Sequence, residues 1–194
     1  YSTDYLDWSP HGIRDGIRKT LGDNSWGENI QGIPGGRDLG KEYVDAFPCA
    51  YRQWRADSHC NTIHGYAFSM KFYFGTNQLD VRNWVADYGG LKPLKKTLED
   101  QFDHTLLVAE DDPHLDIYKE LQARKLAKLT ILPKLGCEGL ADQLYKYVNG
   151  VFIPEAFGQA EAERLWCFRV EVRETQANMA YREGHREWNE DLFE

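Results

Sequence analysis

Hydrophobic positions divide the chain into a weakly patterned N-terminal part and a core with regular periodicity. Residues 1–42 are rich in Gly, Asp, Asn and Ser and show little periodicity, which predicts an irregular N-terminal extension. Within it, Gly32–Gly40 has the glycine content of a phosphate-binding loop, but it lacks the Gly-Lys-Ser/Thr ending that grips phosphates. Its Pro-Gly-Gly turn chemistry favours a plain loop.

Four segments after residue 42 have the composition of β-strands. Residues 43–54 and 66–74 are dense in aromatic side chains, which favour extended structure. Residues 126–133 form an apolar run that ends at a proline. Residues 165–175 alternate apolar and polar side chains with the period of a half-buried strand. We therefore predict four strands.

Helical periodicity falls between these strands. Leucine and phenylalanine recur at helical spacing through residues 91–102, and residues 138–148 carry a similar apolar face. Residues 116–125 predict a more charged helix, and the insertion at 154–164 contains a short helical stretch. The main elements predict an α+β fold, a four-stranded antiparallel sheet with two helices on one face. The open sheet edges favour pairing between subunits, so we expect a closed homo-oligomer.

The overall composition restricts the class of protein. The 194 residues suit one domain over 43–181 with a charged tail over 182–194, and 42% hydrophobic residues supply a core. A net charge of −8 argues against a general nucleic-acid or anionic-membrane surface. The four cysteines include no CxxC pair, and no apolar run reaches the length of a membrane span. We therefore expect a cytoplasmic protein that binds neither nucleic acid nor membrane.

Three places in the core carry side chains suited to proton transfer or ligand binding. Cys60 lies four residues before His64, and a thiol near an imidazole can become a reactive thiolate, although most such pairs are ordinary core or loop residues. Asp103 beside His104 can act as an acid–base pair, but the same position suits a histidine that ends a helix. Glu174 can accept two parallel hydrogen bonds from an amino-pyrimidinone edge, or it can be a plain surface carboxylate.

Taken together, these residues resemble one enzyme family. Five motifs follow the order found in that family, and the resemblance covers residues 43–181. The motifs are Cys60-Asn-Thr-Ile-His64-Gly-Tyr66, Trp84-Val-Ala-Asp87-Tyr88, Phe102-Asp103-His104-Thr-Leu-Leu107, Cys137-Glu138-Gly-Leu-Ala141 and Val172-Arg173-Glu174-Thr175. The chain resembles the 6-pyruvoyl-tetrahydropterin synthase and 6-carboxytetrahydropterin synthase (QueD) family.

The resemblance implies the tunnelling fold (T-fold) and a hexamer, a dimer of trimers, with active sites between subunits. It also implies a lyase of pterin or 7-deazaguanine (queuosine) biosynthesis that acts on 7,8-dihydroneopterin triphosphate or a related pterin. By this resemblance Cys60 is the general base, Asp103 and His104 are an acid–base pair from a neighbouring subunit, and Glu174 anchors the pterin ring. The short Cys-x-x-x-His-Gly spacing resembles the 6-carboxytetrahydropterin synthase branch better.

The zinc site of that family is altered in this sequence. The family holds Zn²⁺ with three histidines, of which His64 is kept, while Tyr51 and Tyr66 stand at the other two positions. Neutral tyrosine is a poor zinc ligand because its phenol titrates near about pH 10. We therefore expect zinc to be lost or weakly bound. The alternatives are a harder ion such as Fe³⁺ bound by phenolate, and His59 as a replacement ligand.

The altered zinc positions leave two further hypotheses open. One is a non-catalytic protein that reuses the fold to bind a pterin or purine-like ligand, or to serve a structural role. The other is an enzyme with a changed substrate, in which the two tyrosines enlarge the aromatic wall of the site.

Overall fold

The computed structural model describes residues 37–184, which are built on a single mixed sheet. The extension expected over 1–42 and the tail expected over 182–194 lie outside the described residues, apart from 37–42 and 182–184. Residues 37–42 and 182–183 of these described ends belong to strands rather than to irregular chain. The first strand begins at Arg37, inside the expected extension, and the last strand ends at Glu183.

Within residues 37–184 the sheet has six strands, in the spatial order β4-β3-β1-β2-β5-β6. The strands are β1 (Arg37–Tyr51), β2 (His64–Thr76), β3 (Thr105–Ala109), β4 (Leu129–Leu132), β5 (Leu165–Arg173) and β6 (Met179–Glu183). The pairs β1–β2, β2–β5 and β5–β6 are antiparallel, whereas β1–β3 and β3–β4 are parallel. The predicted α+β class is confirmed. The predicted sheet of four antiparallel strands had too few strands, and it missed the parallel pairing of β1, β3 and β4.

Three helices match the periodic segments of the sequence to within two residues. They are α2 (Lys92–Phe102), α3 (Leu115–Ala123) and α4 (Cys137–Tyr147). Shorter turns complete the described chain: η1 (His59–Asn61), η2 (Tyr88–Leu91), the π-helical η3 (Val148–Phe152), α5 (Ile153–Phe157) and α6 (Gln159–Ala162). The insertion at 154–164 is therefore more helical than predicted.

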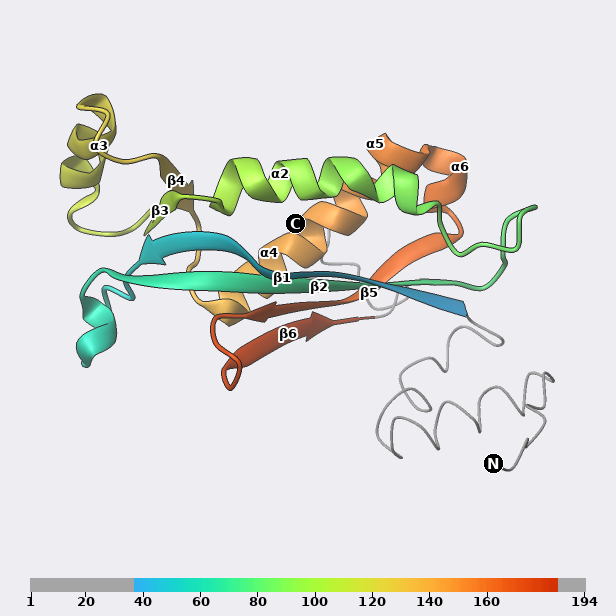
Figure 1. The fold of residues 1–194 in the computed structure, drawn as a ribbon, viewed down its shortest axis with the longest axis horizontal. Coiled ribbons are helices and arrows are strands. Elements are labelled where there is room, and N and C mark those ends of the chain that lie inside the picture. Colours follow the sequence, from blue (N-terminus) through green and yellow to red (C-terminus); the bar gives the residue numbers. More distant parts are fainter. Residues whose placement is uncertain (1–36, 185–194) are drawn as a thin grey trace.

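One face of the sheet is covered by helices. Figure 1 shows α2 lying along β1 and β2, while α4, which contacts β5 and β6, crosses the sheet on the same side. Every second residue of β2 faces these helices because side chains alternate along a strand. The resulting core joins Phe68, Met70, Phe72 and Phe74 of β2 to Leu94 and Leu98 of α2 and to Leu140 and Tyr145 of α4. Burial of these large apolar side chains is the main driving force of the fold.

A buried asparagine joins the end of α4 to β5. The Asn149 side-chain amide donates to the carbonyl oxygens of Tyr145, at 3.1 Å, and Cys167, at 2.9 Å. Its own oxygen accepts from the amide of Cys167 at 2.9 Å. Asn149 therefore satisfies both backbone groups of Cys167 inside the core, where unpaired polar groups are costly.

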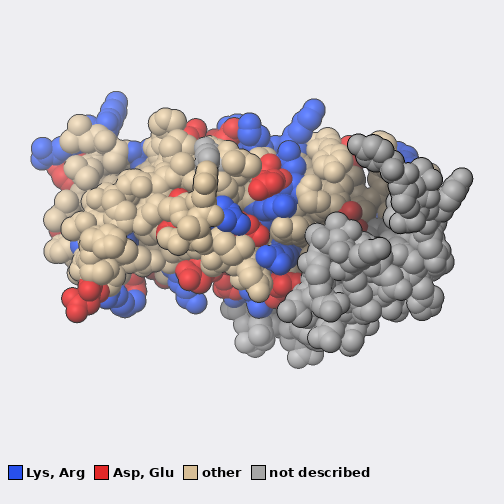
Figure 2. Space-filling model, turned by 60° about the horizontal axis from the view of Figure 1, so that its bottom comes forward, with Lys and Arg blue, Asp and Glu red and all other residues tan. Residues whose placement is uncertain are grey.

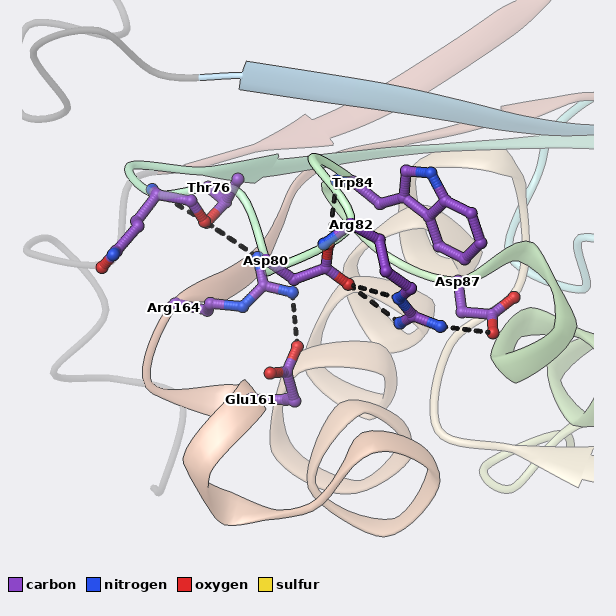
Figure 3. Close-up of polar contacts among 8 residues, drawn as sticks. Thr76, Asp80, Arg82, Trp84, Asp87, Glu161 and Arg164 are labelled. Atoms are coloured by element: carbon purple, nitrogen blue, oxygen red, sulfur yellow. Dashed lines mark hydrogen bonds and ion pairs between the residues drawn. The ribbon is translucent and has the colours of Figure 1, made fainter.

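A polar network fixes the connection between β2 and α2 (Figure 3). The Asp80 carboxylate accepts from the amides of Arg82 and Trp84 and pairs with the Arg82 guanidinium at 2.8 Å. These bonds lower the pKa of Asp80, the Trp84 amide contributing most. The guanidinium of Arg164, which lies just before β5, donates a hydrogen bond to a backbone oxygen of the same connection. It also forms an ion pair with Glu161. The chain therefore enters α2 along a defined path.

Charged side chains of both signs are interspersed on the face shown in Figure 2. Basic residues there alternate with acidic ones, whereas a surface for a polyanion gathers basic residues together. Among the helices of residues 37–184, none has the length and apolar character needed to cross a membrane.

Candidate active site

A cavity of about 340 Å³ lies at the end of β1 and the start of β2, where they meet the start of α4 and the turn between β5 and β6. It is lined by Tyr51, Gln53, Cys60, His64, Tyr66, Gly136, Cys137, Glu138, Glu174, Asn178 and Met179. The fold thus brings together five residues that the sequence singled out: Tyr51, Cys60, His64, Tyr66 and Glu174. They come from distant parts of the chain, so only the tertiary fold creates this cluster.

Strand register places the three rings of the cavity on one face. Tyr51 of β1 lies directly opposite His64 of β2 in the antiparallel ladder. Tyr66 follows two residues after His64, and residues two apart share a face of a strand. The Tyr51 and Tyr66 rings are stacked with their centroids 4.8 Å apart, and the Tyr51 and His64 centroids are 6.4 Å apart.

Glu174 follows the last residue of β5 and is held by two neighbours. Its Oε2 accepts a hydrogen bond from the Tyr51 hydroxyl at 3.0 Å, and its Oε1 accepts from the Asn178 side chain at 3.4 Å. Burial raises the pKa of Tyr51 well above its ordinary value, and the charge of Glu174 raises it further. Tyr51 therefore stays protonated and acts as a donor to the carboxylate.

His64 is fixed by hydrogen bonds at both ring nitrogens. Its Nδ1 lies 2.6 Å from the backbone oxygen of Thr62, and its Nε2 lies 2.5 Å from the Tyr66 hydroxyl. A carbonyl oxygen only accepts, so Nδ1 carries the proton of the singly protonated ring and Nε2 accepts from Tyr66. Tyr66 has a raised pKa, mainly because of burial and then because of the nearby Glu174 charge.

Cys60 is the most accessible of the four cysteines. It lies in η1, its amide donates to the Ser58 hydroxyl at 3.3 Å, and its side chain is half-buried. The other three thiols are buried, and burial raises the pKa of Cys49 and of Cys137 to about 12. Cys60 is therefore the thiol best placed to meet a ligand in the cavity.

Asp103 and His104 do not line this cavity in the same chain. Asp103 Oδ1 lies 2.7 Å from His104 Nδ1, and the side chains are 37% and 82% exposed. His104 has a φ of 52°, a left-handed conformation that histidine adopts more readily than most residues, and its amide donates to the Pro48 oxygen at 2.7 Å. This turn ends α2 and starts β3 beside β1. The two residues form an exposed pair.

The sequence pattern of the 6-pyruvoyl tetrahydropterin synthase family matches residues 42–185. The chain belongs to this family. The match spans most of the chain and includes the five residues Tyr51, Cys60, His64, Tyr66 and Glu174, which line the cavity. The resemblance inferred from the five sequence motifs is thereby confirmed.

Curated relatives within the pterin synthase family are named 6-carboxy-5,6,7,8-tetrahydropterin synthase. The protein of Rickettsia conorii is 29% identical over 70 residues, which are 36% of this chain and 51% of that protein. The protein of Aquifex aeolicus is 28% identical over 95 residues, covering 46% of this chain and 57% of that protein. The matched region thus spans about half the length of these relatives.

Solved structures of other proteins share the fold of this chain. An uncharacterized protein from Wolinella succinogenes superposes with a TM-score of 0.64 at 15% identity, covering 77% of this chain and 99% of that one. A catalytic residue mutant of the Plasmodium vivax 6-pyruvoyltetrahydropterin synthase has a TM-score of 0.52 at 17% identity, covering 76% of this chain and 98% of that one. These likenesses confirm the predicted T-fold.

The zinc that the pterin synthase family is expected to hold does not suit the donors in this pocket. The three positions carry Tyr51, His64 and Tyr66, and both phenols have raised pKa values that keep them protonated. The Nε2 of His64 is already engaged by Tyr66. His59, the suggested replacement ligand, is not among the cavity-lining residues, and within residues 37–184 no three His, Cys, Asp or Glu side chains gather as a metal site. One imidazole and two neutral phenols are a poor set for Zn²⁺.

Several lining residues of this pterin synthase relative were not predicted as site residues. Gln53, Cys137, Glu138, Asn178 and Met179 join the cavity through tertiary packing. Cys137 and Glu138 belong to one of the five motifs that resemble the family, so that motif is a usable signal for these two positions. Asn178 lies four residues after Glu174, and its contact depends on the turn between β5 and β6.

Proposed function

We propose that this chain is an enzyme of the 6-carboxytetrahydropterin synthase type, a lyase acting on 7,8-dihydroneopterin triphosphate or a related pterin. The observation that carries this proposal is that Cys60 and Glu174, distant in sequence, line one cavity together with two aromatic rings. The family membership, the names of the curated relatives and the Cys-x-x-x-His-Gly spacing support the same branch.

In this proposal Glu174 binds the ring of the substrate. A carboxylate offers about four acceptor positions, so Tyr51 and Asn178 hold it in place without exhausting it. The remaining lone pairs accept the paired N–H groups of an amino-pyrimidinone edge, a charge-assisted contact that fixes orientation. The stacked rings of Tyr51 and Tyr66 supply an aromatic wall beside this anchor.

Cys60 then acts as the base on the side chain of the bound pterin. In its thiolate form, Cys60 at the cavity wall takes a proton from a substrate carbon or hydroxyl and becomes a neutral thiol. The Tyr66 hydroxyl, whose proton lies toward His64 Nε2, keeps an oxygen free to accept a hydrogen bond from a substrate hydroxyl. These groups move protons and orient the side chain without a metal.

The return of a proton is assigned to Asp103 and His104 of a neighbouring subunit. The two side chains are exposed, and they do not line the cavity of their own chain. Residues that complete the site of another chain must be placed in this way. This assignment requires a homo-oligomer, for which we propose the hexamer of paired trimers. Sedimentation analysis of the purified protein tests it, and a monomer would contradict it.

The decisive experiment measures turnover of 7,8-dihydroneopterin triphosphate with and without added Zn²⁺. We expect product formation that does not require the metal, and a loss of at least about 100-fold in kcat for Cys60→Ser. Asp100→Asn, which removes an exposed carboxylate that pairs with Lys96 on the surface of α2, is the control and should match the wild type. No turnover under any condition, with an active control enzyme, would refute the enzymatic proposal.

A second candidate function is a pterin- or purine-binding protein without turnover. The observation that favours it is the replacement of two metal-ligand histidines by Tyr51 and Tyr66, whose hydroxyls are hydrogen-bonded to Glu174 and His64. Ligand binding that depends on Glu174, combined with no product formation, would support this candidate over the lyase.

A further inference from the structure

The segment 52–63, which connects β1 to β2 and carries Cys60, has no buried side chain. Its short helix η1 likewise contains no buried residue. Apolar packing therefore does little to fix the segment, although the position of a catalytic base must be fixed closely. The contacts that hold it are polar, and they begin at Arg52.

Arg52 forms a two-pronged ion pair with Asp112, in the turn between β3 and α3. Its Nε lies 2.9 Å from Asp112 Oδ2, and its Nη2 lies 2.9 Å from Asp112 Oδ1. The side chains are only 16% and 2% exposed. Asp112 is itself held in place, because its Oδ1 also accepts from the His114 amide at 2.9 Å. Such bidentate pairs fix geometry as well as charge.

The third nitrogen of the same guanidinium holds the residue next to Cys60. Arg52 Nη1 donates to the backbone oxygen of Asn61 at 3.3 Å and to its side-chain oxygen at 3.1 Å. Because the guanidinium is planar and rigid, a carboxylate that fixes one edge also fixes the direction of the other. The neighbouring Gln53 amide donates to the Cys60 oxygen at 2.8 Å, which ties the two ends of the segment together.

A second aspartate supports the same segment. Asp111 accepts from the Trp54 indole at 3.0 Å and pairs with Arg55 at 2.8 Å. The Arg55 guanidinium lies 4.2 Å over the Trp54 ring. The Arg55–Asp111 ion pair is more exposed than the Arg52–Asp112 ion pair. The Arg52–Asp112 pair therefore contributes more to holding segment 52–63 in place.

We propose that Asp112 is a positioning residue for Cys60, acting through Arg52 and Asn61. The turn between β3 and α3 thereby sets where the thiol stands in the cavity. The catalytic part of this inference rests on the proposed function of Cys60, whereas the positioning part concerns the thiol alone. An experiment on the thiol can therefore separate the two.

The test follows alkylation of Cys60 by iodoacetamide in the full chain, with peptide mass spectrometry. Cys49, Cys137 and Cys167 are buried, so Cys60 reacts first. In Asp112→Asn the alkylation rate of Cys60 should rise at least about fivefold, because the segment loses its anchor. The kcat for the pterin should fall about 10- to 100-fold with KM changed less than about threefold.

Two further variants make the result specific. Asn61→Ala removes one acceptor of Arg52 at the far end and should give a smaller rise, which also provides a test if Asp112→Asn does not fold. In the double variant the alkylation rate of Cys60 should rise no more than in Asp112→Asn alone, because both changes act through Arg52. If the two changes instead loosened the fold in general, their effects on the rate would be additive. Asp100→Asn is the charge-matched control and should label like the wild type.

The outcomes separate this inference from the proposed function. Alkylation rates within about twofold of the wild type in both single variants would overturn the positioning role, whatever their activity. A faster rate in Asp112→Asn without any wild-type turnover would support the positioning role and refute the lyase. Additive effects in the double variant would also count against a path through Arg52.

Discussion

The Tyr51 hydroxyl donates a 3.0 Å hydrogen bond to the Glu174 carboxylate. This contact joins a position where the family places a zinc ligand to the residue that we propose as the ring anchor. In that proposal the phenol orients the Glu174 carboxylate through this hydrogen bond. In the proposed function, the two tyrosines of this pocket therefore take part in binding the ligand.

Replacing Tyr51 by phenylalanine should weaken pterin binding. The change removes the donor that orients Glu174 and keeps the ring that stacks on Tyr66. Because hydrogen bonds to charged groups contribute about 1.5–3 kcal/mol, we expect the Kd to rise about tenfold or more, as measured by fluorescence titration. Tyr88→Phe, at an exposed position, is the control. Equal affinities in both variants and the wild type would show that Tyr51 does not support the anchor.

Restoring the histidines should restore the metal. In the double variant Tyr51→His, Tyr66→His, three imidazoles would stand on adjacent strands at the registered positions of Tyr51, His64 and Tyr66. We expect zinc near one per chain in this variant and well below that in the wild type, measured by elemental analysis after dialysis. Stoichiometric zinc in the wild type would contradict our account of the two tyrosines.

Much of the fold was predictable because the long elements have clear periodicity. Helices α2 and α4 present apolar faces at helical spacing, and residues 169–173 of β5 alternate charged and apolar side chains. The strands β3 and β6 were missed for a physical reason. Each has five residues, β3 is buried on both faces and so shows no alternation, and β6 lies in a polar sequence without buried residues.

The site was predictable where motifs carry the chemistry and unpredictable where packing creates it. Cys60, His64 and Glu174 belong to family motifs, and they do meet in one cavity. The contact between Arg52 and Asp112 has no local signal, because it joins the end of β1 to a turn that follows the unpredicted strand β3. Long-range polar pairs of this kind depend on strand order, which the sequence pattern does not specify.

The buried Asn149 should be important for stability. Asn149→Ala removes three hydrogen bonds and leaves both backbone groups of Cys167 without these partners inside the core. We expect the free energy of unfolding to fall by about 2–4 kcal/mol in urea denaturation. Asn77→Ala, at an exposed position, should change it by less than about 0.5 kcal/mol. A similar small change at Asn149 would show that the core tolerates the loss.

The contribution of Asp112 to stability should depend on pH. Burial raises the pKa of this carboxyl, but the hydrogen bonds from Arg52 and the His114 amide outweigh burial and lower it below 3.8. The stabilisation is therefore complete well above that value and is lost as the pH falls through the lowered pKa of the folded state. Asp112→Asn should cost about 3 kcal/mol at neutral pH, and its Tm difference from the wild type should shrink toward about pH 3. A difference that is constant with pH would contradict this assignment.

In the proposed function, Glu174 organises the cavity as a pterin site. Calorimetric titration of neopterin into the wild type and into Glu174→Gln tests it most directly, with Glu110→Gln as an exposed control. We predict saturable binding to the wild type and to Glu110→Gln, and a Kd at least about tenfold higher for Glu174→Gln. Equal binding by wild type and Glu174→Gln, or no binding by the wild type at millimolar ligand, would show that Glu174 does not organise a pterin site here.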